Sequence, residues 1–118
     1  MRRRASHAVT PELLDSVAAR FKVLSEPARL RVLHELRTRP LHVSALMGAT
    51  GLNQANLSKH LQLLHAHGFV SRRRDGQFTF YAIADEGVFT LCDLVCGHLE
   101  RDGEQRMARL RPSNFHVR

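Results

Sequence analysis

Tryptophan is absent from this 118-residue chain, tyrosine occurs once and cysteine only twice. Two cysteines cannot build the disulfide framework of a small secreted domain, and their scarcity fits a reducing compartment. The chain also lacks any apolar run that approaches the roughly 18 residues needed by a membrane-spanning helix. We therefore predict a cytoplasmic protein with no membrane partner.

The beginning of the chain lacks the features of a targeting peptide. Three arginines at positions 2–4 are followed by no apolar segment, and acidic side chains arrive early at Glu12 and Asp15. A secretory signal needs that apolar segment, and a transit peptide is poor in acids. The sequence therefore predicts neither kind of targeting peptide.

Length and composition fit one domain with a modest core. With 118 residues, 43% of them apolar, the chain can bury one core made of helices and a small sheet. We predict this domain over residues 10–111. Residues 1–9 are expected to form a flexible basic N-terminus, and residues 112–118 a flexible C-terminal tail.

Acidic residues are outnumbered, so the chain is strongly basic. Its formal net charge is +7, and such a charge favours an acidic partner, most simply nucleic acid. Almost all of the cations are arginines, and an arginine-rich, lysine-poor composition is also typical of a GC-rich genome. The positions of the arginines therefore have to decide between the two interpretations.

Two helices are expected in the first third of the chain. Thr10 is a suitable N-cap for the first helix, Pro11 suits its first turn, and apolar residues follow at helical spacing. The second helix is expected to begin near Pro27 and to end before Pro40.

The next stretch has the pattern of two helices joined by a turn. We predict a short helix over residues 42–48, a glycine-containing turn to residue 52, and a longer helix over residues 53–66 that Asn53 caps. The inward stripe of the longer helix is expected to consist of Leu57, Leu61 and Leu64.

The opposite side of the longer helix carries no acidic residue. A solvent-exposed helix usually mixes acids with bases, whereas this side presents amides, a hydroxyl and a cation, the groups that read base edges and phosphates. A short helix, a turn and such a helix form a helix-turn-helix. A plain helical hairpin with a polar face is the alternative. The candidate DNA-contacting residues here are Gln54, Asn56, Ser58, Lys59 and Gln62.

A β-hairpin is predicted between residues 69 and 83, where Asp75-Gly76 joins two β-like runs. A hairpin that follows a helix-turn-helix is a wing, and wing arginines can hold phosphates or enter the minor groove. A solvated charge run beside a turn is the alternative. The candidate DNA-contacting residues of the wing are Arg72, Arg73, Arg74 and Gln77.

The last predicted helix, over residues 85–101, carries two overlapping apolar stripes. One stripe includes Val88 and Val95, and the other includes Phe89 and Cys96. Their combined width exceeds what a helix packed on one side requires. We therefore expect this helix to pack against its own domain and also against a partner chain.

The chain resembles the ArsR/SmtB family of winged-helix repressors in the order of its predicted elements and in the sequences of three motifs. The order is helix, helix, helix-turn-helix, hairpin, helix. The motifs are FKVLSEPARLRVLHEL, GLNQANLSKHLQLLHAHGFV and RRRDGQFTFYAI, and the resemblance covers residues 12–101. It implies a mainly α fold with a small antiparallel β hairpin, a winged helix-turn-helix that dimerises through its first and last helices.

The resemblance also implies a function. Family members are expected to be homodimeric repressors that bind a palindromic operator in double-stranded DNA and are released by an effector, often a metal or metalloid ion. The helix over residues 53–66 would be the recognition helix. His60 lies where the family often has a histidine, which supports this helix or touches DNA.

The sensing sites of the family are absent or incomplete in this chain. Where one site has a Cys-x-Cys pair, this chain has His42 and Ser44. A second site takes four ligands from the last helix; Asp85 and His98 match two of them, and a glycine and an arginine occupy the other positions. Two ligands from each chain make a poor tetrahedral site. A persulfide-sensing variant needs a cysteine on the second helix, where this chain has none.

Cys92 and Cys96 are the remaining candidates for an effector contact. They lie one helical turn apart, with Cβ atoms about 5–6 Å from each other, whereas a disulfide needs about 3.8 Å. Two thiolates at this spacing can grip one soft metal or metalloid ion, and thiols can also be oxidised. Cysteine is equally a good small apolar side chain, so sensing and packing both stay open.

The predicted function is that of a sequence-specific DNA-binding transcriptional repressor without enzymatic activity. A protein that binds DNA without sequence specificity, or independently of any effector, is the alternative. A thiol enzyme built on Cys92 and Cys96 is disfavoured, because His98 lies off the face of both cysteines and no third catalytic group is evident. No cofactor is certain, and a soft metal or metalloid ion is the candidate.

Overall fold

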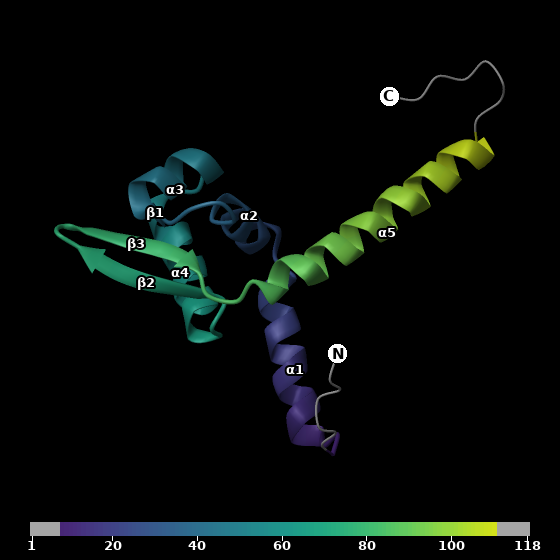
Figure 1. Cartoon of the computed structure of the whole chain (residues 1–118), viewed down its shortest axis with the longest axis horizontal. Helices are drawn as coiled ribbons and strands as arrows, with labels where there is room; N and C mark the ends of the chain where they lie inside the picture. The colour runs from purple at the N-terminus through teal and green to yellow at the C-terminus, as the bar shows by residue number, and fades with distance from the viewer. Residues whose placement is uncertain (1–7, 111–118) are drawn as a thin grey trace. The chain divides into compact units, whose positions relative to one another are not determined.

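The structure is a computed structural model that describes residues 8–110 (Figure 1). Residues 1–7 of the predicted flexible N-terminus and the whole predicted C-terminal tail, residues 112–118, lie outside the described residues, as does residue 111 of the predicted domain. The chain separates into two compact units between Ala84 and Asp85. Residues 8–110 include no helix with the length and apolar character needed to cross a membrane.

The first unit contains helices and a small sheet, and the described part of the second unit contains one long helix. The elements in chain order are α1 (Pro11–Leu24), α2 (Pro27–Glu35), β1 (Leu41–His42), α3 (Val43–Thr50), α4 (Gln54–Ala66), β2 (Val70–Asp75), β3 (Phe78–Ile83) and α5 (Gly87–Leu110). This order confirms the expected winged helix-turn-helix, which is mainly helical with an antiparallel hairpin.

Local capping residues place α1 and α2. Thr10 caps α1, because its Oγ1 accepts a hydrogen bond from the backbone N–H of Leu13 at 3.1 Å. Glu26 caps α2, because its Oε1 accepts from the N–H of Ala28 at 3.4 Å. Each cap is followed by a proline in the first turn, where the missing N–H costs no hydrogen bond.

The core of the first unit joins its helices to its sheet. The predicted inward stripe of α4 is confirmed, because Leu57, Leu61 and Leu64 are exposed by 0%, 1% and 0%. Burying each leucine contributes about 2 kcal/mol, so this stripe sets the rotation of α4 about its axis. The other buried apolar residues of the unit are Val23, Val32, Leu33, Leu36, Leu41, Leu46, Phe69, Val70 and Tyr81.

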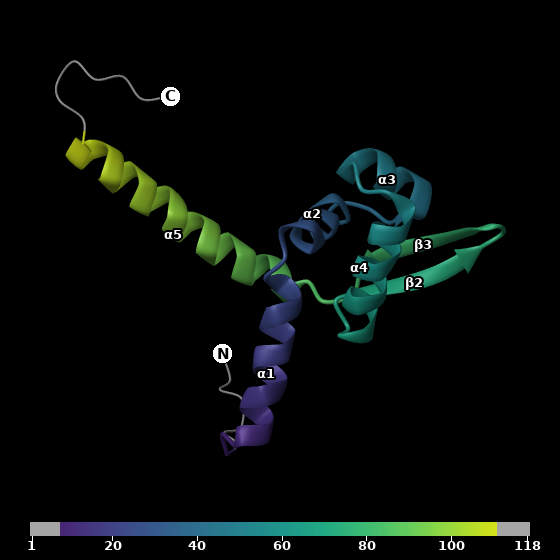
Figure 2. The ribbon, with the colours of Figure 1, turned by 180° about the vertical axis from the view of Figure 1, so that it is seen from behind.

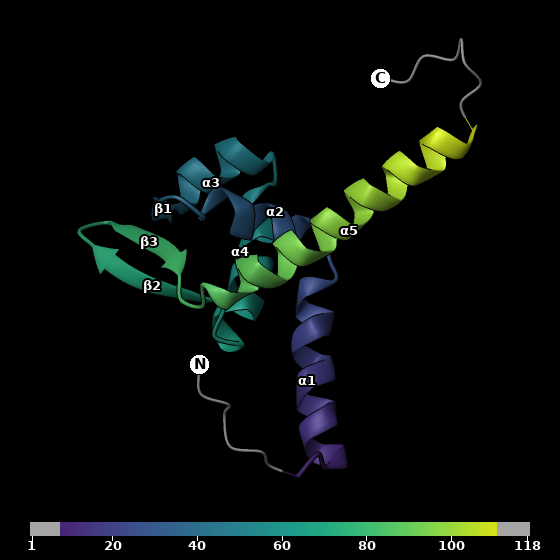
Figure 3. The same cartoon turned by 45° about the vertical axis from the view of Figure 1, so that its right-hand side comes forward.

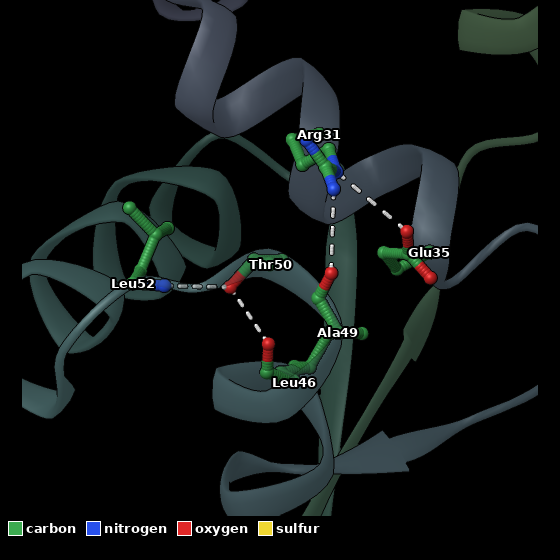
Figure 4. A network of polar contacts seen from close by, with 6 residues as sticks. All are labelled: Arg31, Glu35, Leu46, Ala49, Thr50 and Leu52. Carbon is green, nitrogen blue, oxygen red and sulfur yellow. Dashed lines mark hydrogen bonds and ion pairs between the residues drawn. The ribbon is translucent and has the colours of Figure 1, made fainter.

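The turn between α3 and α4 is held by side-chain hydrogen bonds (Figure 4). Thr50 Oγ1 donates to the carbonyl of Leu46 at 2.7 Å and accepts from the N–H of Leu52 at 3.3 Å. Arg31 of α2 donates from Nη2 to the carbonyl of Ala49 at 3.5 Å. These bonds tie the end of α3 both to the turn and to the neighbouring helix.

The end of α3 differs from the sequence prediction. The helix continues through Gly48 to Thr50, whereas its predicted end was residue 48. It stops where Gly51 adopts a left-handed backbone conformation, with φ at +77°. Glycine adopts this conformation without the steric cost that a Cβ imposes, so Gly51, and not Gly48, ends the helix.

The sheet has three antiparallel strands in the order β1-β3-β2, whereas the sequence predicted only the β2–β3 hairpin. The missed strand, β1, pairs Leu41 with Tyr81 and His42 with Phe80. Figures 1 and 2 both show the hairpin extending away from the helices of the first unit, with α4 beside its base. The sheet therefore links the start of α3 to the wing.

The hairpin turn lies one residue later than predicted. Asp75 pairs with Phe78, so the two-residue loop consists of Gly76 and Gln77 and not of Asp75-Gly76. Gly76 has a φ of +63°, and no other residue type among the described residues has a positive φ. This pattern is that of a type II′ turn, which takes glycine first. It places Gln77 at the tip of the wing.

The long helix α5 also departs from its predicted bounds (Figure 3). It begins at Gly87, whose N–H donates to Oδ1 of Asp85 at 2.9 Å, and it ends at Leu110 and not near residue 101. An ion pair at 3.3 Å joins Arg106 to Asp102 one turn apart. Because the residues beyond 101 are mostly polar, apolar periodicity gives no sign of this continuation.

We expect Gly51→Ala to lower the free energy of unfolding by about 1–2 kcal/mol, because an L residue is strained at positive φ. An added Cβ would meet no atom within 4 Å, so the cost lies in the backbone alone. Gly48→Ala is the matched control. It lies inside α3, its Cβ would also meet nothing within 4 Å, and it should stabilise the chain by about 0.5–1 kcal/mol. Urea unfolding measures both effects, and equal stabilities would contradict this assignment of the turn.

Candidate nucleic-acid interface

The side of α4 opposite its leucine stripe is a polar surface. Gln54, Asn56, Lys59 and Gln62 are exposed on it, and Ser58 is half-buried. Within residues 8–110 the Lys59 ammonium forms no ion pair, and α4 contains no acidic residue. The helix therefore presents a cation and amides, and no acidic group, to solvent.

The wing carries the three predicted arginines, all exposed, but they do not share one face. Successive side chains of a strand point to opposite faces, so Arg72 and Arg74 lie on one face of the hairpin and Arg73 on the other. The Arg73 guanidinium is 5.8 Å from the ring centroid of Phe80. Arg74 Nε donates to the carbonyl of Gly76 at 3.1 Å, which braces the turn. The wing thus offers cations on both of its faces.

A groove of about 390 Å³ lies between α3 and the tip of the wing, and the predicted residues Gln54, at the start of α4, and Gln77 both line it. His42 also lines this groove and is stacked on Phe78, with ring centroids 4.9 Å apart. Nδ1 of His42 accepts a hydrogen bond from the N–H of Ala45 at 3.3 Å. The imidazole that stands where the family has a thiolate therefore caps α3.

His60 lies at the edge of the polar surface of α4 and is half-buried. Its Nδ1 is 3.2 Å from Nη1 of Arg29 in α2. Burial lowers the pKa of His60 below its usual value, and the positive charge of Arg29 lowers it further. Glu26 raises the pKa by a smaller amount, and Lys59 lowers it slightly. The imidazole is therefore neutral at neutral pH.

The predicted effector residues lie on α5. Cys92 is half-buried, Cys96 is exposed, and no disulfide joins them. Around them the apolar face stays uncovered, with Leu94, Val95 and Leu99 exposed by 63%, 52% and 65%. Among the described residues, Cys96 is therefore not part of the buried core.

Asp85 and His98 match half of a family metal site, and they stay a prediction. Among the described residues, no three side chains of His, Cys, Asp and Glu gather as a metal ion would need. Asp85 accepts the hydrogen bond from the N–H of Gly87 at the start of α5. A complete tetrahedral site at these residues would need ligands from a second chain.

The sequence of the winged unit matches a known family. Residues 26–72 match the family described as bacterial regulatory protein, arsR family. Over 91 residues, 76% of its length, the chain is 37% identical to the HTH-type transcriptional regulator Rv0081 of Mycobacterium tuberculosis, of which it covers 80%. The chain belongs to the ArsR family. It is therefore a DNA-binding transcriptional regulator with a winged helix-turn-helix, as the resemblance implied.

Two further relatives of this ArsR-family chain differ in how much of their own length the match covers. It is 41% identical over 83 residues to the HTH-type transcriptional regulator Rv0324 of Mycobacterium tuberculosis; the match takes 70% of this chain but only 37% of that protein. It is 30% identical over 105 residues to a probable mercury resistance operon repressor of Streptomyces lividans, and the match takes 78% and 84% of the two chains.

Solved structures of the family share the fold. The crystal structure of Rv0081 matches with a TM-score of 0.73 and 33% identity, over 84% of this chain and 99% of that one. The solution structure of Mb0332 from Mycobacterium bovis matches with a TM-score of 0.72 and 32% identity, over 97% and 100% of the two chains. Mb0332 is described as a homodimeric winged helix-turn-helix DNA-binding domain of a possible ArsR-family regulator.

We expect the stability contributed by His60 to depend on pH. Its pKa is lowered in the folded chain by burial and by Arg29, so the unfolded chain takes up the proton first as the pH falls below about 6.5. The free energy of unfolding therefore falls between that pH and the lower folded pKa. Urea unfolding at about pH 7.5 and about pH 5.5 should show a larger loss for the wild type than for His60→Gln, which cannot titrate in this range. Equal losses in the two proteins would contradict the lowered pKa.

Proposed function

We propose that this ArsR-family regulator is a homodimeric repressor that acts in the cytoplasm, without enzymatic activity, on a palindromic operator in double-stranded DNA. The observation that carries the proposal is the exposed side of α4, which joins the cation of Lys59 to several amides and has no acid. Such groups read base edges and phosphates when a recognition helix enters the major groove. The proposed DNA-contacting residues are Gln54, Asn56, Ser58, Lys59, His60, Gln62, Arg72, Arg73, Arg74 and Gln77.

The proposed dimer is supported by the apolar residues that α1 and α5 leave exposed. Leu14 and Phe21 of α1 are exposed by 55% and 53%, and Leu94 and Leu99 of α5 by 63% and 65%. Clusters of exposed large apolar side chains are typical of protein interfaces, and the related Mb0332 domain is homodimeric. A two-fold dimer would present two recognition helices about one DNA turn apart, as a palindromic operator requires.

Lys59→Ala should weaken binding to every DNA sequence and flatten its salt dependence. Each neutralised phosphate contributes about 0.9 to the slope of log K against log salt, so a dimer that loses two lysines should lose about 2 from that slope. Lys22→Ala, which removes the other lysine of the chain from α1, is the matched control and should leave the slope unchanged. Anisotropy titrations at several salt concentrations measure the slope. An unchanged slope for Lys59→Ala would place α4 outside the groove.

The same titrations separate a repressor from a protein that coats DNA. Selection from a random DNA library supplies the operator, and random DNA of equal length supplies the competitor. A repressor should bind its operator at least about 10³-fold more tightly than the competitor. Equal affinity for both would favour non-specific binding.

We further propose that Cys92 and Cys96 contact the effector, a soft metal or metalloid ion or a thiol-reactive compound. The two thiols lie one turn apart on α5, one half-buried and one exposed. Thiolates select soft ions, and one relative is named a probable mercury resistance operon repressor. The alternative is that the two cysteine side chains only pack in the proposed dimer interface.

If the cysteines sense the effector, mercuric ion or a thiol-reactive reagent should release the wild type from operator DNA but leave Cys92→Ser/Cys96→Ser bound. We expect the affinity of the wild type to fall by about 5- to 150-fold, the usual range of allosteric coupling. Cys92→Ala/Cys96→Ala controls for packing and should also resist release. Equal release of the wild type and the serine variant would assign the cysteines to packing.

A further inference from the structure

Arg29 lies where three helices of the winged unit meet. It belongs to α2, and its Nε donates to the carbonyl of Val23 in α1 at 2.6 Å. Its Nη1 is 3.2 Å from Nδ1 of His60 in α4. Arg29 and His60 are both half-buried, so part of each side chain is shielded from water. One guanidinium therefore contacts the end of α1 and the side of α4 at the same time.

This contact determines where the proton of the neutral His60 ring resides. A guanidinium has five N–H donors and no acceptor, and it keeps its charge at any ordinary pH. In a hydrogen bond with Arg29, Nδ1 of His60 must therefore be the acceptor. A neutral imidazole carries its proton on the other nitrogen when Nδ1 accepts. The ring is thus left with a single donor, Nε2–H.

The position of His60 on α4 suits this donor to the DNA backbone. His60 directly follows Lys59 and lies one turn after Asn56, and both of these side chains are exposed on the proposed DNA-contacting surface. His60 itself is half-buried at the edge of that surface. Phosphate contacts fix the register and orientation of a protein on the duplex, and an N–H at the edge of a recognition helix can make one.

We propose that Arg29 positions His60 as a neutral hydrogen-bond donor to a phosphate oxygen of the operator, with Nδ1 bonded to Arg29 and Nε2–H bonded to the DNA. Arg29 is then a positioning residue that does not itself touch the DNA. In the other tautomer, Nε2 would turn a lone pair toward the phosphate and Nδ1–H would face the Arg29 donors, so both contacts would be lost. This inference rests on the proposed operator binding by α4.

Two variants of His60 separate a DNA contact from a role in supporting the helix. In His60→Asn the amide replaces the Nδ1 side of the ring, so it can still accept from Arg29 but is too short to reach the DNA. In His60→Gln the amide replaces the Nε2 side, so it can donate to a phosphate but no longer matches Arg29. Each variant is first checked for cooperative thermal unfolding.

Operator titrations of the full chain then give the decisive comparison. Loss of one hydrogen bond from each half-site should weaken His60→Asn by about tenfold, whereas His60→Gln should stay within about threefold of the wild type. The salt slope of both variants should equal that of the wild type, because a neutral donor releases no counterion. If His60 only supports the helix, the order reverses. Equal affinities for the two variants, or tighter binding by His60→Asn, would overturn the proposal.

The tautomer is measured without DNA, which keeps this test distinct from that of the proposed function. In ¹⁵N spectra of the free protein, Nε2 of His60 should carry the proton, and Arg29→Leu should produce a mixture of tautomers. Arg29→Leu should also weaken operator binding, but it should add nothing in a His60→Asn background. A proton on Nδ1 in the wild type, or an additive effect of Arg29→Leu, would overturn the role of Arg29. A wild type that binds no palindrome would instead refute operator binding.

Discussion

The burial of one leucine stripe is the constraint on which the DNA-facing surface depends. Leu57, Leu61 and Leu64 are exposed by 0%, 1% and 0%. Because residues at this spacing share one side of a helix, their burial holds α4 in one rotation about its axis. Lys59 must then face solvent, since turning it inward would bury an unpaired charge at a cost of several kcal/mol. Apolar packing, and not the polar residues themselves, therefore creates the polar surface.

The arginines of this chain serve two purposes, and net charge does not distinguish them. Arg29 and Arg31 each donate to a backbone carbonyl and so hold helices in place. Arg74 also donates to a carbonyl, in the wing turn, but it is exposed and belongs to the proposed DNA-contacting residues as well. Arg72 and Arg73 are exposed on opposite faces of the hairpin. The formal net charge of +7 is the difference between 18 basic and 11 acidic side chains, and it does not say which of the cations can reach DNA. The position of each guanidinium decides its role, because a bond to a carbonyl fixes where the charge can reach.

Most of the elements could be predicted from the sequence, because their signals act over a few neighbouring residues. Thr10 and Asn53 are N-caps in the structure as expected, and Gly76 marks the hairpin turn within one residue. The polar, acid-free side of α4 could also be predicted, because it differs from the usual mixture of charges on an exposed helix, whereas DNA contact by its residues stays a prediction. The length of α5 could not be predicted from the sequence, because the last turns of this helix are polar and contain no apolar repeat.

The sequence by itself determined which helix bears a polar, acid-free side and which segment forms the wing, since both follow from local periodicity and turn residues. Only the tertiary structure decided the rest. Strand β1 is two residues long and exists through its pairing with the distant β3. Arg29 and His60 are 31 positions apart and meet because α2 packs on α4. Proton placement and a lowered pKa at His60 follow from that contact and from burial, and neither exists in an unfolded chain.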